Sequence, residues 1–147
     1  MERVHATCVA LAVGEDWCGV LLRGPSGSGK SDLALRLIDA GARLVSDDQT
    51  ELTASSGEVV ARAPESLAGR LEVRGVGILA FEYLAEAPVG LVCDLCAPSD
   101  VPRLPEAQTV WIAGSELPRL WLAPFESSAV AKVRLGLDTA RRGILGH

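Results

Sequence analysis

Short runs of apolar residues, broken by turns, alternate along this chain with only two stretches of helical periodicity. The runs over residues 4–13 and 17–22, separated by the polar turn 14–16, predict two neighbouring strands. Residues 49–54 and 58–63, joined by a Ser-Ser-Gly turn, predict a hairpin. The other apolar runs predict further short strands, over residues 42–46, 71–73, 78–81, 89–96, 109–113 and 120–122.

Two segments have the apolar period of a helix that is buried on one side. Apolar residues recur at i and i+4 over residues 30–40, and Gly41 follows at a position typical of a helix end. A second helix is predicted over residues 127–142, with Ser127 or Ser128 as its N-cap. Many strands with two helices indicate an α/β domain with a mixed sheet, since a parallel sheet would need regular strand–helix alternation.

Composition and charge narrow the class of protein. The chain has 147 residues, of which 48% are hydrophobic and 22% charged, and this predicts one globular domain over residues 1–147. The net charge is −5 and no basic cluster is present, which argues against a nucleic-acid partner. The longest uncharged apolar run, residues 6–14, is far shorter than a membrane span and lacks a basic start. We therefore expect a cytoplasmic protein with no membrane partner.

Four cysteines raise the question of a metal site or a disulfide. Cys93 and Cys96 have the spacing of half a zinc site, but no second such pair or histidine cluster completes it. Residues three apart on a strand point to opposite faces, so these two thiols are poorly placed to form a disulfide. We expect Cys8, Cys18, Cys93 and Cys96 to be reduced thiols, most of them buried.

The strongest chemical signal is a glycine-rich segment between the second strand and the first helix. It satisfies the pattern G-x-x-x-x-G-K-S, in which backbone N–H groups and a helix N-terminus surround phosphate oxygens. Lysine binds the β and γ phosphates in such loops, and the final hydroxyl can ligate Mg²⁺. The alternative, a turn that only caps a helix, does not account for a lysine here in a chain with two lysines. The predicted phosphate-binding residues are Gly24, Pro25, Ser26, Gly27, Ser28, Gly29, Lys30 and Ser31.

Two adjacent carboxylates follow the strand after the loop's helix. We expect that strand to lie beside the strand that precedes the loop, so that Asp47 and Asp48 come near the phosphates. Adjacent side chains at a strand end point to opposite sides, which predicts different tasks for the two acids. One would accept a proton from an attacking hydroxyl, and the other would hold the loop or a metal. The alternative is a solvated acidic turn.

Four further residues have side chains that could take part in chemistry, and two of them have two interpretations. Glu72 and Arg74 lie on one side of a predicted strand, either as a surface ion pair or as a metal ligand beside an arginine that neutralises phosphate. His5, on the first strand, is by itself a half-exposed residue of no clear role. His147 ends the sequence and is expected to be inert.

Three segments in this order resemble the HPr kinase/phosphorylase family. They are the glycine-rich segment 24–31, the segment 43–48 that ends in two aspartates, and the Glu-Val-Arg-Gly stretch within 71–77. The resemblance runs from His5 to about Phe81, and the length is similar to a short form with the catalytic domain alone. It implies a mixed-sheet P-loop kinase domain of the phosphoenolpyruvate-carboxykinase-like type. It also implies ATP-dependent phosphorylation of a serine on an HPr-like phosphocarrier, regulation of a phosphotransferase system, and the reverse phosphorolysis.

The same resemblance implies roles for individual residues. Lys30 and the loop amides would hold phosphates, and Ser31 with Glu72 would hold Mg²⁺. Asp47 would be the base that takes the serine proton, braced by Asp48. The histidine at position 5 matches one near the family's active site, and the arginine at position 74 belongs to its signature.

The second half of the chain departs from longer members of the family. Between Cys96 and Pro124 the chain is short and includes a proline-rich loop, residues 98–105, where longer members carry an arginine-bearing loop implicated in phosphorolysis; Arg103 is the candidate substitute. We expect this loop to be the most mobile part of the chain, and kinase activity to be better supported than phosphorylase activity. Residues 124–128 likewise replace an arginine-containing segment of longer members, and these departures count against the family's usual hexamer, so that a homo-oligomer stays an open possibility. Two other functions stay open: a small-molecule P-loop kinase and a non-catalytic ATP-sensing module.

Overall fold

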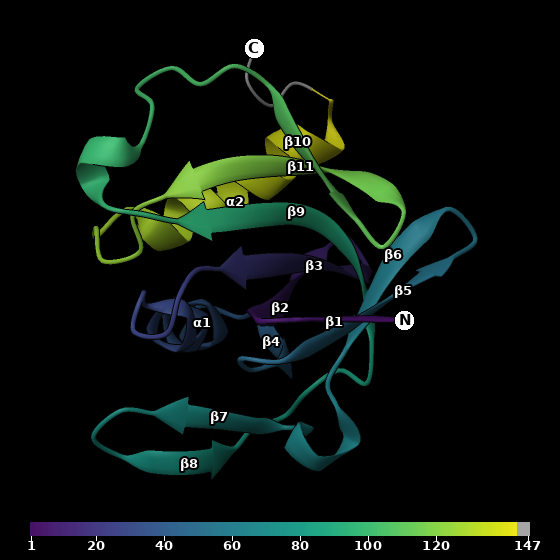
Figure 1. Ribbon diagram of the computed structural model, residues 1–147. Coiled ribbons are helices and arrows are strands. Elements are labelled where there is room, and N and C mark those ends of the chain that lie inside the picture. Colours follow the sequence, from purple (N-terminus) through teal and green to yellow (C-terminus); the bar gives the residue numbers. More distant parts are fainter. Residues whose placement is uncertain (144–147) are drawn as a thin grey trace.

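The computed structural model describes residues 1–143, and His147 lies outside them. Nine strands form one mixed sheet, in the order β1-β5-β6-β9-β3-β2-β4, with β11 on β9 and β10 on β11 (Figure 1). A separate hairpin pairs β7 with β8. The strands are β1 (Glu2–Val4), β2 (Ala6–Val13), β3 (Asp16–Arg23), β4 (Arg43–Ser46), β5 (Thr50–Ser55), β6 (Glu58–Arg62), β7 (Arg70–Val73), β8 (Gly77–Ala80), β9 (Ala87–Leu95), β10 (Gln108–Ile112) and β11 (Ser115–Leu122).

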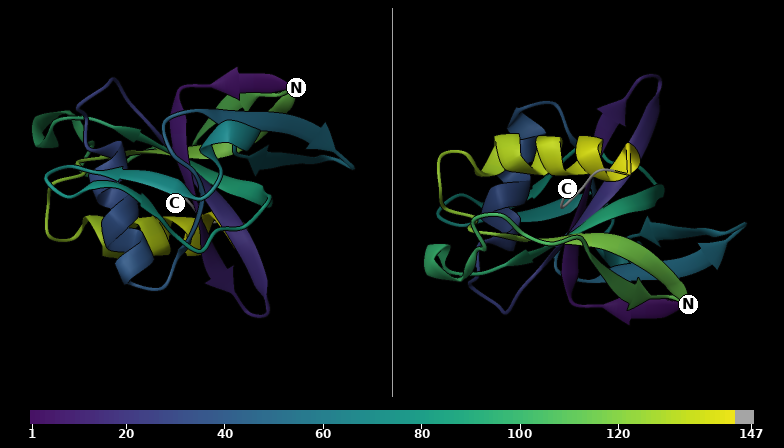
Figure 2. Two further views of the ribbon diagram at one scale, coloured as in Figure 1. Left: turned by 90° about the horizontal axis from the view of Figure 1, so that it is seen from below. Right: turned by 90° about the horizontal axis from the view of Figure 1, so that it is seen from above.

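Two helices, α1 (Lys30–Asp39) and α2 (Ala129–Arg141), cover one face of this sheet (Figure 2). Leu33 and Leu37 of α1 and Val133 and Leu137 of α2 are buried in one core with the apolar side chains of that face. The sheet curls so that its other face also encloses apolar side chains, among them Leu52 of the β5–β6 hairpin. The expected mixed-sheet α/β class is confirmed.

Most of the predicted elements are present with bounds shifted by one or two residues. Both helices are confirmed, and Ser128 is the N-cap of α2, although its side chain makes no capping hydrogen bond. Gly41 follows α1 with a positive φ of 112°, which a glycine adopts without strain. The first predicted strand is divided at His5 into β1, which pairs with β5, and β2, which pairs with β3.

Two expectations about strands were wrong. Strand β4 does not lie beside β3; it pairs with β2, which runs antiparallel between them. Strand β11 begins at Ser115, five positions before the predicted start, and forms a hairpin with β10. The register shows why Pro118 does not interrupt it: Pro118 pairs with Thr109 of β10, and β9 joins β11 only from Arg119 onward.

The directions of four strands position the candidate site. Strands β9 and β11 run parallel to β3, and β4 has the same direction because both β3 and β4 are antiparallel to β2. Their carboxyl ends therefore meet at one edge of the sheet. The turns that follow them, and residues 24–29 before α1, gather along this edge (Figure 1). Over residues 1–143, no helix has the length and apolar character needed to cross a bilayer.

Candidate active site

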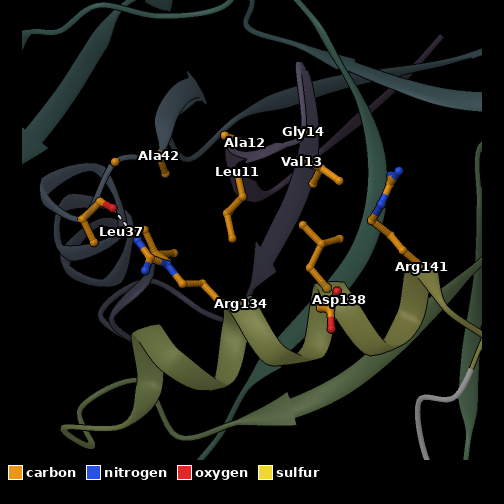
Figure 3. Close-up of a pocket in the computed structure, with 12 residues that line it drawn as sticks. Leu11, Ala12, Val13, Gly14, Leu37, Ala42, Arg134, Asp138 and Arg141 are labelled. Carbon is orange, nitrogen blue, oxygen red and sulfur yellow. Dashed lines mark hydrogen bonds between the residues drawn. The ribbon is translucent and has the colours of Figure 1, made fainter.

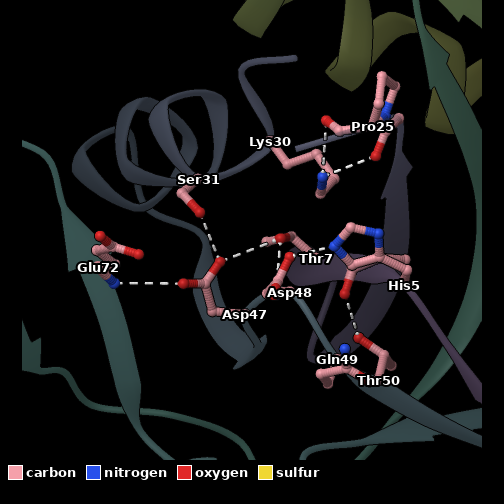
Figure 4. A network of polar contacts seen from close by, with 12 residues as sticks. His5, Thr7, Pro25, Lys30, Ser31, Asp47, Asp48, Gln49, Thr50 and Glu72 are labelled. Atoms are coloured by element: carbon pink, nitrogen blue, oxygen red, sulfur yellow. Dashed lines mark hydrogen bonds and ion pairs between the residues drawn. The ribbon is translucent and has the colours of Figure 1, made fainter. Parts of the chain in front are cut away.

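The glycine-rich loop, residues 24–31, joins β3 to the start of α1. Lys30 begins the helix and is 5% exposed, and its Nζ donates hydrogen bonds to the carbonyls of Gly24 (2.7 Å) and Pro25 (3.1 Å) (Figure 4). Gly29 precedes it with φ of 103°, and a Cβ there would lie 2.8 Å from Cζ of Phe125. Only glycine satisfies both conditions, so the loop has a backbone path and a buried ammonium of the kind that phosphate-binding loops use.

The carboxylate of Asp47 is the centre of a polar network at the mouth of this loop (Figure 4). Its Oδ1 accepts hydrogen bonds from the hydroxyls of Ser31 (2.7 Å) and Thr7 (3.1 Å). Its Oδ2 accepts one from the backbone N–H of Glu72 at 3.2 Å. Three donors from α1, β2 and β7 therefore fix the orientation of one carboxylate, and the interpretation of Asp47 as part of a solvated turn is wrong.

Asp48 faces a different partner from its neighbour. Its Oδ1 lies 2.5 Å from Nε2 of His5, and its backbone N–H donates to Oγ1 of Thr7 at 3.0 Å. Asp48 has a positive φ of 67°, an uncommon conformation that turns the chain between the two carboxylates. The two acids thus have different partners although both line one cavity, and the structure brings His5 to the site through Asp48.

Thr7 is a site residue that the sequence reasoning missed. It is fully buried, and its hydroxyl donates to Asp47 while it accepts from the backbone of Asp48. The only signal in the sequence was one hydroxyl side chain within the otherwise apolar or thiol-bearing run 6–13. Phe125 was missed as well, and no local pattern pointed to it. The backbone carbonyl of Pro124 accepts a hydrogen bond from Arg36 of α1, which holds Phe125 against the loop.

A cavity of about 380 Å³ opens at this network. Lys30, Ser31, Asp47, Asp48, Glu72, Arg74 and Phe125 are among its lining residues. The structure thus brings together every predicted site residue except Gly24, Pro25, Ser28 and His5, which do not line this cavity. Of these, Pro25 and Ser28 line a neighbouring cavity, and His5 contacts Asp48. In residues 1–143 no ion pair joins Glu72 to Arg74, so the alternative of a surface pair between them was wrong. Both side chains are exposed at the cavity mouth.

The oxygen atoms at the cavity suit Mg²⁺. Ser31 and Asp47 are in direct contact, and Glu72 lines the same cavity. No group of three or more histidine, cysteine, aspartate or glutamate side chains that could enclose a metal occurs within the described part of the chain. Mg²⁺ does not need such a group, because beside phosphates and water it takes one or two protein oxygens. The donors present therefore fit Mg²⁺ held together with a phosphate group.

Two arginines outside the cavity have a structural role. Asp94, at the end of β9, accepts hydrogen bonds from Arg23 (2.8 and 3.0 Å) and Arg119 (2.5 Å). Arg103 is exposed on the loop after the 3₁₀ turn Pro98–Asp100 and does not line the cavity.

All four cysteines are free thiols; Cys8, Cys18 and Cys93 are buried and Cys96 is half-buried. Burial raises the pKa of the Cys8 and Cys93 thiols, which keeps them protonated.

A larger cavity, of about 540 Å³, lies at the other end of α1 (Figure 3). It is formed by the turn after β2, the end of α1 and one face of α2, including Arg134, Asp138 and Arg141. Arg134 donates a hydrogen bond to the carbonyl of Ala40, at the end of α1. None of the predicted site residues lines this cavity.

Comparison with known proteins gives one consistent family. The model of the HPr serine kinase C-terminal domain matches residues 1–85. HPr kinase/phosphorylase from Clostridium perfringens is 49% identical over 61 residues, and that from Xylella fastidiosa is 48% identical over 67 residues. These segments cover 42% and 45% of this chain but only 20% and 21% of the two relatives.

A solved structure supports the fold over nearly the whole chain. The Hpr(Ser) kinase/phosphatase from Coxiella burnetii superposes with a TM-score of 0.82 at 24% identity, and the match covers 98% of this chain and 99% of that one. Since the family model spans more than half of the residues and includes the whole network around Asp47, the chain belongs to the HPr serine kinase C-terminal domain family.

Proposed function

We propose that this chain is an ATP-dependent kinase that phosphorylates a serine of an HPr-like phosphocarrier protein. The observation that carries the proposal is the hydrogen bond from Ser31 of the glycine-rich loop to Asp47. It joins the element that would bind the phosphates to a carboxylate that could accept a proton. Binding and proton transfer would therefore occur within one cavity, as phosphoryl transfer requires.

The loop and Lys30 would bind the phosphates of ATP. The ammonium of Lys30 donates to two loop carbonyls. Charged phosphate oxygens would be stronger acceptors for this ammonium and would take the place of the carbonyls. The N-terminus of α1 would add its partial positive charge. Mg²⁺, when bound, would neutralise the charge that develops on the transferred phosphoryl group, and Ser31 with Glu72 would hold it.

Asp47 would take the proton of the attacking serine. Its Oδ1 already accepts two hydroxyl donors, whereas Oδ2 accepts one backbone N–H and retains a lone pair toward the cavity. The hydrogen bond from the backbone N–H of Asp48 to Thr7 would brace that geometry. The contact of the Asp48 carboxylate with His5 would keep the charge of Asp48 away from Asp47. Arg74, exposed at the cavity mouth, would neutralise phosphate or contact the acceptor protein.

The reverse reaction would use the same groups. Inorganic phosphate would attack the phosphoserine, the P–O bond to serine would break, and protonated Asp47 would return its proton to the serine oxygen as pyrophosphate leaves. No residue of the loop at 98–105, including Arg103, lines the cavity. For this reason we expect phosphorolysis to be slower than the kinase reaction.

The test is transfer of labelled phosphate to a protein acceptor. The chain is incubated with γ-labelled ATP, Mg²⁺ and HPr, and the phosphorylated position is mapped by mass spectrometry. Label on one HPr serine, absent with the Lys30→Ala variant, supports the proposal. Binding of ATP without transfer to HPr would favour the ATP-sensing module. Transfer to a small metabolite instead would favour a small-molecule kinase, and either result would overturn the proposal.

A further inference from the structure

A third cavity, of about 440 Å³, lies on the far side of the glycine-rich loop from Asp47. Three segments enclose it: the loop itself at Pro25 and Ser28, the end of β9 with Cys96 and Pro98, and the turn at Pro124 and Phe125. All three follow parallel strands, so they meet at the same edge of the sheet (Figure 1). Apart from the glycine-rich loop itself, none of the segments that line this cavity has a role in the proposed function.

The lining is mostly apolar and includes one exposed aromatic ring. The side chain of Phe125 is 69% exposed, an uncommon exposure for a large apolar residue held in a fixed turn. Proline, alanine and leucine side chains make up most of the rest. The Oγ of Ser28 is buried and has no hydrogen-bond partner among the described residues. A flat apolar group with a few polar atoms would complement such a lining.

The cavity borders the one at Asp47, and the two share one lining residue. Phe125 lines both cavities, and its ring packs against Gly29 between them. The loop also contributes to both, with Ser26 and Lys30 on one side and Pro25 and Ser28 on the other. A ligand whose phosphates lie at the loop would thus have its other end directed past Phe125.

We propose that this apolar cavity binds the nucleoside end of the nucleotide, with the base stacked on Phe125. The inference rests on the proposed function, because it assumes phosphates at the glycine-rich loop. Aromatic stacking accepts any nucleobase, and the lining offers few polar groups to select one. A second copy of this chain or an apolar segment of the acceptor protein are the competing occupants.

Calorimetric titration with ADP and with pyrophosphate, both with Mg²⁺, separates the base from the phosphates. In the Phe125→Ala variant we expect the Kd for ADP to rise about tenfold, the usual effect of losing one base–aromatic contact, with a much smaller change for pyrophosphate, which makes no stacking contact. Phe125→Trp should retain ADP binding, since it keeps a stacking surface. Trp111→Ala, which removes an equally exposed aromatic ring on β10, is the matched control and should bind both ligands normally.

A second measurement needs no substitution at the cavity. Cys96 is the one half-buried thiol among the four and lines the cavity, whereas the others are buried. Its alkylation by iodoacetamide, followed by peptide mass spectrometry, should slow when ADP is bound and should not slow with pyrophosphate.

The outcomes separate this inference from the proposed function. The inference would be overturned if Phe125→Ala and the unmodified chain bound ADP equally well and ADP did not protect Cys96. Binding of pyrophosphate in the same experiment would leave the assignment of the glycine-rich loop intact. A change in oligomeric state alone in Phe125→Ala, seen by sedimentation, would also overturn it in favour of a second copy. Failure of the unmodified chain to bind either ligand would overturn both proposals.

Discussion

Each end of helix α1 borders a cavity, and the two cavities differ in the charged groups that line them. At the N-terminal end, the smaller cavity has a buried ammonium and a carboxylate held by three donors. At the C-terminal end, the larger cavity has Arg134 bonded to the carbonyl of Ala40. A cation at a helix C-terminus offsets the helix dipole and satisfies a terminal carbonyl. The arginine there is accounted for by structure, whereas Lys30 is the cation to which the proposed function assigns a ligand.

The largest expected effect comes from removing the cation at the N-terminal end. Lys30→Ala should abolish the rise in melting temperature that ATP produces, because the loop loses its contact with the β and γ phosphates. Arg134→Ala removes a cation at the other end and is the matched control. It should keep the ATP response and reduce the free energy of unfolding by less than about 1 kcal/mol. An ATP response in the lysine variant equal to that of the unmodified chain would remove the distinction between the two ends.

Loss of the charge on Asp47 is expected to come next. Asp47→Asn keeps the size of the side chain and can still accept from Ser31, so ADP should bind as before. The rate of phosphate transfer to HPr should fall by about 10² or more, the usual contribution of a general base. Asp39→Asn, an exposed acid at the far end of α1, should leave the rate unchanged. An unreduced rate in the Asp47 variant would assign the base to another group.

Thr7 should have an intermediate effect through Asp47. Thr7→Val removes the buried hydroxyl at constant shape and leaves the backbone N–H of Asp48 without its acceptor. We expect a loss of about 1–3 kcal/mol in the free energy of unfolding and a lower kcat with little change in KM for ATP. Thr7→Ser restores the hydroxyl and should recover kcat. A fall in stability alone, with kcat retained, would show that Thr7 only supports packing.

The smallest effect is expected at Glu72. Its backbone N–H contacts Asp47, and this contact survives the change to glutamine. Glu72→Gln should raise the Mg²⁺ concentration for half-maximal transfer a few-fold, since Mg²⁺ loses one carboxylate ligand. Because the side chain is exposed, the melting temperature should not change. An unshifted Mg²⁺ titration would leave Asp47 or Asp48 as the carboxylate ligand.

Local signals in the sequence were sufficient for the elements and for most of the residues that line the candidate site. The glycine-rich loop could be located because its spacing is a property of eight consecutive residues, and both helices followed from their apolar period. Asp47 and Asp48 were found because they follow directly after a buried strand. The order of the strands was not available in the same way, since any antiparallel neighbour of β3 satisfies the same apolar pattern.

The sequence by itself determined which segments are strands and helices, where a glycine-rich loop joins a strand to a helix, and which acids follow the next strand. Only the tertiary structure decided that β2 lies between β3 and β4, and hence that Thr7 and His5 reach the two acids. It also decided that Phe125, almost one hundred positions from Gly29, packs on the loop. The physical reason is that element type depends on residues a few positions apart. Contacts between distant segments depend instead on how the whole sheet curls to bury both of its faces.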